Sequence, residues 1–267
     1  MNYKLFFPTY ANRFYFVKEQ LNKHSGGSNI WTSALNIGTG EGDYDPMIKN
    51  RVKLLLGVDI NEEDLVYAAQ LNRNIPGISY KKEDALNLSF PENSFDLIVS
   101  VDVIEHVGAP EKMLSEIARV LKPGGFVFIT FPQIHYPFTY DPVNKFLEWI
   151  STHKIPEGAY AFGHTELLDP EKFKKWTVAS GLQVVREKNL SGYLAALVEM
   201  YWTGWVQRIF KANAKNSTVN ESNNRTLRPG SNIPVLSICT RWFCKLDYWL
   251  FKNSKYAVGK GFVLVKK

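Results

Sequence analysis

Residues 34–42 read A-L-N-I-G-T-G-E-G, a short apolar run that leads directly into three glycines at every second position. A second apolar run, residues 54–58, is followed by Asp59. A strand that enters a glycine turn, and a second strand that ends on a carboxylate, are typical of an α/β sheet that binds a nucleoside. The glycines let the backbone approach the ligand, and the carboxylate accepts hydrogen bonds from a ribose diol.

The glycine spacing indicates which nucleoside is favoured. A dinucleotide fingerprint, G-x-G-x-x-G, would require a glycine at position 43, where the chain has Asp43. The spacing G-x-G-x-G suits a ligand that places no pyrophosphate on a helix N-terminus. We therefore expect a nucleoside with a zwitterionic tail in preference to NAD.

With these residues the chain resembles the class I S-adenosylmethionine (SAM) methyltransferases, particularly the type 11 branch with the ubiquinone and menaquinone methyltransferases. Three later segments extend the resemblance over roughly residues 30–190. Residues 82–96 contain K-E-D-A-L and P-E-N-S-F-D, and residues 97–107 read L-I-V-S-V-D-V-I-E-H-V. Residues 113–125, M-L-S-E-I-A-R-V-L-K-P-G-G, predict an amphipathic helix with a Pro-Gly-Gly stop before a strand at 126–131.

The resemblance implies an α/β, Rossmann-like seven-stranded sheet with helices on both faces, mostly parallel, whose last strand is antiparallel between the fifth and sixth. We expect the sixth strand at 181–186, the seventh at 261–265, a helix at 14–21 over the cofactor and a capped helix after Asn61. The methyltransferase domain would comprise residues 1–192 and 258–267. Residues 193–257 would form a helical insertion before the last strand.

The resemblance also implies SAM as the cofactor and assigns the residues that contact it. The glycine turn would surround the methionine end, Asp59 the ribose, and Asp84 with the next backbone N–H the adenine. Relatives usually carry an acid where this chain has Asn36, so we expect weaker cofactor binding here. The expected cofactor-binding residues are Asn36, Gly38, Thr39, Gly40, Gly42, Asp59, Ile60, Asp84, Ala85, Val101 and Asp102. No metal site is expected.

Methyl transfer from a sulfonium is an in-line displacement, so the protein must position the acceptor and, for a hydroxyl acceptor, remove a proton. His106, His135 and His164 are the candidate bases: His106 lies near a predicted strand end, His135 lies in residues 132–163, which we expect to cover the acceptor, and His164 directly follows them at a position where the resemblance implies a histidine. A structural role is the alternative for each histidine. An activated carbon or an amine acceptor would need no base.

The formal net charge of +6 conceals an asymmetry along the chain. Residues 1–180 carry 18 Lys and Arg against 22 Asp and Glu, whereas residues 181–267 carry 14 against 4. A basic end favours an anionic partner, either a membrane surface or a nucleic acid. Cys239 and Cys244 form neither a disulfide framework nor a metal site, and residues 1–21 do not read as a signal peptide, so a cytoplasmic location is expected.

The insertion contains two apolar segments, 193–210 and 235–251, each with a narrow polar stripe, joined by an Asn/Ser/Lys-rich linker at 211–232 that we expect to be mobile. Charges within both segments argue against a membrane span. Four tryptophans beside basic residues favour helices that lie in a bilayer interface: Trp202, Trp205, Trp242 and Trp249. A helical hairpin packed on the domain or on a second subunit is the alternative.

We therefore predict a SAM-dependent methyltransferase that acts on a small or lipid-like acceptor, with peripheral membrane contact through 193–257. A nucleic-acid methyltransferase is the enzyme alternative; it is less favoured because no N-P-P-Y-type motif follows Val99 and Ser100. A non-catalytic SAM-binding or assembly protein is the third reading. The acceptor, the choice among O-, N- and C-transfer and the oligomeric state stay open.

Overall fold

The computed structural model describes residues 1–25, 31–135, 167–198 and 228–267, and its strands form one sheet in the order β3-β2-β1-β4-β5-β7-β6. The strands are β1 Trp31–Ile37, β2 Val52–Asp59, β3 Ile78–Lys82, β4 Phe95–Val101, β5 Leu121–Pro132, β6 Leu182–Leu190 and β7 Gly259–Lys266. β7 is antiparallel to both β5 and β6, and the remaining neighbours are parallel. The predicted fold class, including the place of the last strand, is confirmed.

The strand order reverses at β1, which pairs with β2 on one side and with β4 on the other. In open α/β sheets such a switch point leaves a crevice beyond the carboxyl ends of the strands. β1 runs directly into the glycine turn, β2 ends on Asp59 and β4 ends next to Asp102. The sequence elements singled out above therefore meet at one edge of the sheet.

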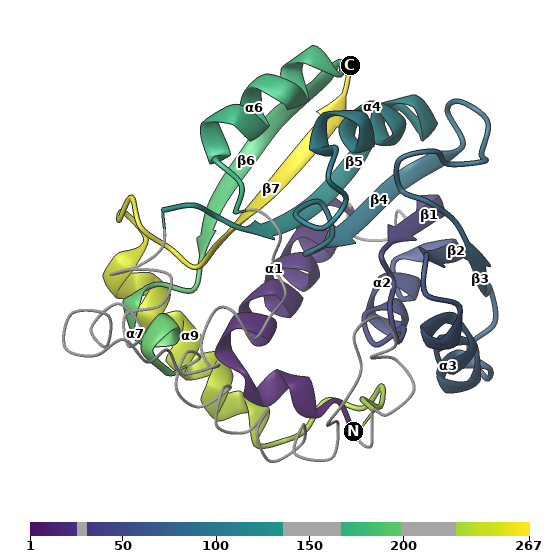
Figure 1. The fold of residues 1–267 in the computed structure, drawn as a ribbon. Helices are drawn as coiled ribbons and strands as arrows, with labels where there is room; N and C mark the ends of the chain where they lie inside the picture. The colour runs from purple at the N-terminus through teal and green to yellow at the C-terminus, as the bar shows by residue number, and fades with distance from the viewer. Residues whose placement is uncertain (26–30, 136–166, 199–227) are drawn as a thin grey trace, which may run out of the picture.

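Helices cover both faces of the sheet (Figure 1). The helices are η1 Tyr3–Phe6, α1 Pro8–His24, α2 Asp45–Lys49, α3 Glu62–Asn72, α4 Pro110–Val120, α6 Pro170–Ala179, α7 Tyr193–Val198 and α9 Ser237–Phe251. The two cores follow the alternation of side chains along each strand. In β4, Ile98 packs in the core that includes α4 and α6, while Leu97 and Val99 pack in the core that includes α1 and α2.

The predicted start of the fifth strand is wrong. The strand expected at 126–131 begins at Leu121, immediately after α4, so the Pro-Gly-Gly sequence lies within β5 and is not a separate stop. Leu121 pairs with Phe95, and the register between β4 and β5 then shifts. Gly124 takes φ 76°, a left-handed conformation that glycine adopts without strain and that suits such an irregularity.

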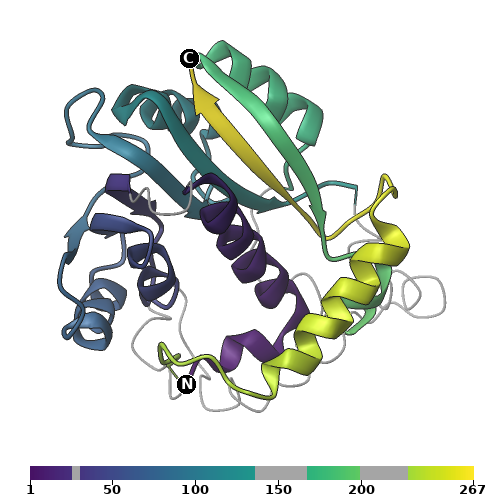
Figure 2. The ribbon, with the colours of Figure 1, turned by 180° about the vertical axis from the view of Figure 1, so that it is seen from behind.

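α9 lies along η1 and α1, outside the sheet (Figure 2). Its buried residues are Ser237, Cys244 and Asp247. Asp247, which departs from the polar stripe expected in the sequence, accepts hydrogen bonds from the backbone N–H groups of Gly192 and Leu194 at the start of α7. This carboxylate caps α7 and joins the two ends of the insertion.

Some sequence predictions fall outside the described residues. These are His164, most of the segment expected to cover the acceptor, residues 199–210 of the first apolar segment and residues 211–227 of the linker. Within the described ranges, no helix has the length and apolarity needed to cross a bilayer. In the same ranges no group of three or more His, Cys, Asp or Glu side chains could hold a metal ion.

Candidate functional site

The glycine turn after β1 combines a tight contact with an open face. Gly38, Gly40 and Gly42 all have positive φ, between 52° and 74°. A Cβ atom on Gly38 would lie 2.2 Å from Val103 Cγ2, so the turn packs closely on the loop after β4. A Cβ on Gly40 would meet nothing within 4 Å. The turn is thus braced at Gly38 and leaves room for a ligand over Gly40.

Asp59 is held at the edge of this turn. Its Oδ2 accepts a hydrogen bond from the backbone N–H of Gly40 at 2.8 Å, and its Oδ1 accepts one from the N–H of Asn61 at 2.9 Å. Each carboxylate oxygen can accept a further hydrogen bond. A diol placed over the turn could therefore bond to both oxygens, which is the geometry required for a ribose.

A buried carboxylate lies beneath the turn, next to the position where relatives usually have an acid. Asp45 is fully buried; its Oδ1 accepts from Asn36 Nδ2 at 2.7 Å, and its Oδ2 accepts from the Thr39 hydroxyl at 2.8 Å and the Tyr80 hydroxyl at 2.7 Å. Burial raises the pKa of Asp45 to about 6, against the effect of these hydrogen bonds. The carboxylate absent at position 36 is thus present nine residues later in the chain.

The expected adenine-binding pair lies just beyond β3. Asp84 is exposed, and its Oδ1 accepts a hydrogen bond from the backbone N–H of Leu86 at 2.8 Å, which fixes the carboxylate on a short turn. Ala85 is buried in the core beneath it. Ile60, after β2, is 69% exposed. An apolar side chain exposed beside Asp59 is available to cover a bound ring.

A charged cluster lies beyond the end of β4. Asp102 adopts a φ of 53°, which is uncommon for a residue with a side chain, and it forms an ion pair with the buried Arg13 of α1. Its Oδ1 also accepts from the Thr130 hydroxyl at 2.9 Å. Burial, reinforced by the nearby Asp102, raises the pKa of Glu105 well above its ordinary value. α1 is therefore tied to the expected methionine end of the site.

His106 adjoins this cluster, with its Nε2 3.9 Å from Glu105 Oε1. Partial burial lowers the pKa of His106, which Asp102 partly opposes, so its imidazole is neutral at neutral pH and able to accept a proton. His135 follows β5, and its carbonyl accepts from the N–H of Ala257 at 3.1 Å. His106 is the candidate base that the structure brings close to Asp102; His164 lies outside the described residues.

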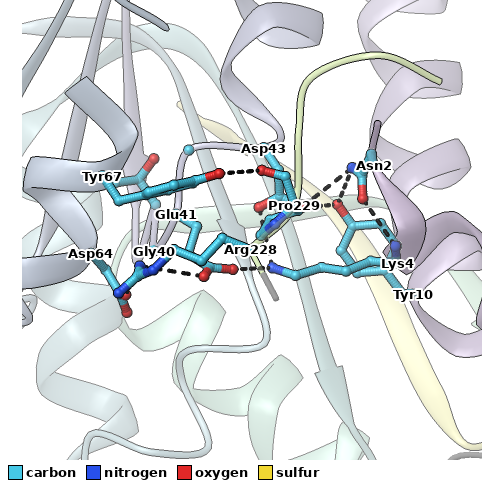
Figure 3. A network of polar contacts seen from close by, with 12 residues as sticks. Asn2, Lys4, Tyr10, Gly40, Glu41, Asp43, Asp64, Tyr67, Arg228 and Pro229 are labelled. Atoms are coloured by element: carbon cyan, nitrogen blue, oxygen red, sulfur yellow. Dashed lines mark hydrogen bonds and ion pairs between the residues drawn. The ribbon is translucent and has the colours of Figure 1, made fainter. Parts of the chain in front are cut away.

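A second set of contacts joins two distant segments of the chain to Glu41 of the glycine turn and to α3 (Figure 3). Lys4 Nζ lies 2.9 Å from Glu41 Oε2, and Arg228 Nη1 lies 3.0 Å from Asp64 Oδ1 and 3.4 Å from Glu41 Oε1. The segments also hold each other, because Asn2 N donates to the carbonyl of Asn232 at 2.7 Å. We call residues 1–4 and 228–232 the clasp.

Several of these residues were not found from the sequence. Arg13 had a usable signal, because it is a charged residue beside the apolar run of α1 that includes Phe14 and Phe16. Asp45 and Tyr80 had none, since their roles depend on a contact between α2 and β3. Lys4 and Arg228 lie 224 positions apart, and neither forms a local pattern with Glu41.

Comparison with known proteins agrees with this geometry. Residues 35–129 match the family described as a methyltransferase domain. The chain is 28% identical over 186 residues to a ubiquinone/menaquinone biosynthesis C-methyltransferase of Cronobacter sakazakii, which covers 62% of this chain and 72% of that protein. It is 34% identical over 98 residues to a phosphatidylethanolamine N-methyltransferase of Cereibacter sphaeroides, covering 36% of this chain and 48% of that protein.

Among solved structures, a putative sarcosine dimethylglycine methyltransferase from Galdieria sulphuraria has the same fold, with a TM-score of 0.58 and 17% identity over 95% of this chain and 86% of that one. The sheet order, the glycine turn and the match at 35–129 lead to one assignment. The chain is an S-adenosylmethionine-dependent methyltransferase whose residues 35–129 match a methyltransferase domain, and it is similar to a ubiquinone/menaquinone biosynthesis C-methyltransferase.

Proposed function

We propose that the enzyme methylates a lipid-like acceptor at a membrane surface, with residues 1–192 and 258–267 holding the cofactor and 193–257 facing the membrane. The observation that carries this proposal is the outer face of α9. Its exposed apolar side chains are Ile238, Trp242, Leu246, Trp249 and Leu250, with exposed fractions of 48–67%. Large apolar side chains contiguous on one helix face are unusual on a soluble surface and mark an interaction site.

In this proposal the glycine turn and Asp59 bind the methionine and ribose parts of SAM, and Asp84 with the N–H of Ala85 binds the adenine. Room over Gly40 and the spare acceptor capacity of Asp59 support the assignment. Asn36 and Thr39 donate hydrogen bonds to Asp45, and these bonds hold the conformation of the glycine turn. Val101 and Ile60 contribute apolar walls beside the cofactor.

Bound SAM supplies the methyl group and the thioether leaving group. The protein orients the acceptor for in-line attack and excludes water. Asp102, fixed by Arg13 and Thr130, lies near the methionine end, where its charge complements a cationic centre. For a hydroxyl acceptor, His106 takes the proton at a ring nitrogen, with His135 and His164 as the other candidates.

The proposal commits to a lipid-like acceptor because the exposed face of α9 is apolar and aromatic. A curated relative is by name a phosphatidylethanolamine N-methyltransferase, which is consistent with this class of acceptor. A nucleic acid fits less well, since the exposed apolar side chains of α9 outnumber its two cations, Arg241 and Lys245.

The test is incubation of the purified enzyme with methyl-labelled SAM and with fractionated lipid and aqueous cell extracts. We expect label in the lipid fraction, and a loss of transfer to vesicle-borne acceptor, but not to detergent-dispersed acceptor, in the variant Trp242→Ser/Trp249→Ser. Val178→Ser, which removes an exposed apolar side chain from α6, is the matched control. Label only in the aqueous fraction, or in nucleic acid, would overturn the proposal.

A further inference from the structure

A cavity of about 610 Å³ lies between α1, the end of β6 and α9. It shares no lining residue with the proposed cofactor site. Six of its lining residues are charged: Lys18, Glu19, Lys23, Lys188, Arg241 and Lys245. Five cations thus surround one carboxylate in a concave space, an arrangement that focuses positive potential on whatever occupies it.

Existing ion pairs leave most of these cations without an acid. Glu19 is already shared by Lys188 at 2.7 Å and by Arg186 at 2.8 Å. Among the described residues, no carboxylate lies within ion-pair distance of the other four lining cations, Lys18, Lys23, Arg241 and Lys245. The site can therefore accept negative charge from outside the protein.

Aromatic rings hold the cations in place around the cavity. The guanidinium of Arg241 lies 4.9 Å from the ring centroid of Tyr15, and Lys188 Nζ lies 4.8 Å from that of Tyr248. Cation–π contacts restrain both side chains, and the contact of Arg241 leaves its N–H donors available for an anion. A small anionic group with several acceptor oxygens, such as a phosphate, matches this set of donors.

The position of the cavity beside α9 indicates which kind of molecule would carry the phosphate group. Arg241, Lys245 and Tyr248 each directly precede a member of the exposed apolar row, namely Trp242, Leu246 and Trp249. Successive residues of a helix are about 100° apart, so the basic stripe lies about a quarter turn from the apolar row. On a helix lying in a bilayer interface, cations in that position are at head-group depth.

We propose that this cavity binds the phosphate of an anionic phospholipid head group while the apolar face of α9 enters the acyl boundary. The inference rests on the membrane location proposed above and adds to it a defined lipid site on α1 and α9. The occupant is a membrane lipid, since a free phosphate would make no use of the adjoining tryptophans. Lipid selectivity would thus be determined outside the methyl-transfer site.

The test measures co-sedimentation of the full chain with phosphatidylcholine vesicles and with matched vesicles that also contain phosphatidylglycerol. We expect tighter binding to the anionic vesicles. Arg241→Gln/Lys245→Gln should reduce that preference by about 30-fold, taking roughly 1 kcal/mol for each basic residue near an anionic surface. Lys18→Gln/Lys23→Gln, on the α1 wall, should reduce it similarly, and serves as the readout if the first pair does not fold.

Lys172→Gln/Lys175→Gln on α6 is the control with the same change in charge, since both lysines are exposed and α6 lies over the other face of the sheet. An equal loss of preference for anionic vesicles in this control would overturn the site, because net charge alone would then explain the preference. Inorganic phosphate is the second arm, titrated by calorimetry. Binding of phosphate that the cavity variants abolish, without lipid preference in the parent, would replace the lipid with a free anion.

The two proposals fail in distinguishable ways. An intact protein that sediments with neither type of vesicle overturns the membrane location itself. An intact protein that sediments equally with both overturns only the head-group site and leaves the apolar face of α9 in its proposed role. Affinity for S-adenosylhomocysteine should be the same in all these variants, because none of the substituted residues lies at the proposed cofactor site.

Discussion

Single residues in this enzyme show how a departure from a family pattern is accommodated. Asn36 lacks the acid expected at its position, and Asp45 places a carboxylate against its amide. The same carboxylate accepts from Thr39 and Tyr80, so one buried acid joins the glycine turn, α2 and β3. The expectation that Asn36 lowers cofactor affinity stays a prediction, and Asp45 gives a physical reason for a small effect.

Asp45→Asn should change how stability depends on pH. Burial raises the pKa of Asp45 to about 6 in the folded protein, against about 3.9 in an unfolded chain. The native state therefore binds this proton more tightly, and the free energy of unfolding falls as pH rises from about 4 to about 6, by roughly 3 kcal/mol. Across that pH window, urea titrations should show the free energy of unfolding of Asp45→Asn rising relative to that of the parent. A difference between the two proteins that stays constant with pH would contradict the assignment.

Asp59→Ala should weaken binding of S-adenosylhomocysteine by about 1.5–3 kcal/mol, the scale for hydrogen bonds to a charged group. The variant removes both acceptor oxygens from the edge of the turn and leaves the N–H groups of Gly40 and Asn61 exposed to solvent. Calorimetry measures the change. Glu62→Ala, which removes an exposed acid in the first turn of α3, is the control. Unchanged affinity in Asp59→Ala, or preferential binding of NAD, would refute the role.

Asp84→Ala tests the adenine contact separately. Because Asp84 is exposed and its hydrogen bond with Leu86 is local, the variant should lose affinity for SAM and keep its thermal transition. If the transition is lost instead, Asp84 serves as a structural cap of the turn after β3. Differential scanning calorimetry and a SAM titration on the same preparation distinguish the two results.

At the scale of elements, local patterns predicted the sheet and the described helices of the insertion, but not the contacts between those helices. The glycine turn, Asn61 as a cap and the amphipathic α4 are each specified by neighbours in sequence. The start of β5 at Leu121 was missed because pairing with β4 outweighs the Pro-Gly-Gly signal. The role of Asp247 was not predicted, since its partners at Gly192 and Leu194 are remote in sequence.

The clasp gives an element-scale prediction, because Lys4 and Arg228 share Glu41. Either substitution alone, Lys4→Met or Arg228→Met, leaves Glu41 paired with the other of these two cations. The double variant leaves this buried acid with neither, so its cost should exceed the sum of the single costs, within the roughly 0.5–3 kcal/mol seen for residues in one network. Urea unfolding of the parent, the two single variants and the double variant measures this double-mutant cycle. Strict additivity would show that the two segments act independently.

At the scale of the molecule, residues 228–251 extend from the proposed cofactor site to the exposed outer face of α9. The clasp connects residues 228–232 to the glycine turn, and α9, a few residues later, lies on α1, whose Arg13 holds Asp102. Helix α1 therefore lies between the outer face of α9 and the proposed methyl-transfer site. Replacing 193–257 with a linker would remove the clasp as well, so substitutions on α9 are the cleaner probe of membrane contact.

The last prediction concerns salt. If α9 meets an anionic bilayer through both tryptophans and cations, binding of the full chain should weaken as ionic strength rises, because exposed charges more than about 10 Å apart are screened at 0.1 M salt. It should not vanish, since apolar burial is unscreened. Trp242→Ser/Trp249→Ser should remove the salt-resistant part, and Arg241→Gln/Lys245→Gln the salt-sensitive part. Vesicle sedimentation across a salt series measures both. A subunit interface would behave differently: sedimentation would be equally weak in all three proteins, and the tryptophan variant would convert a dimer to a monomer.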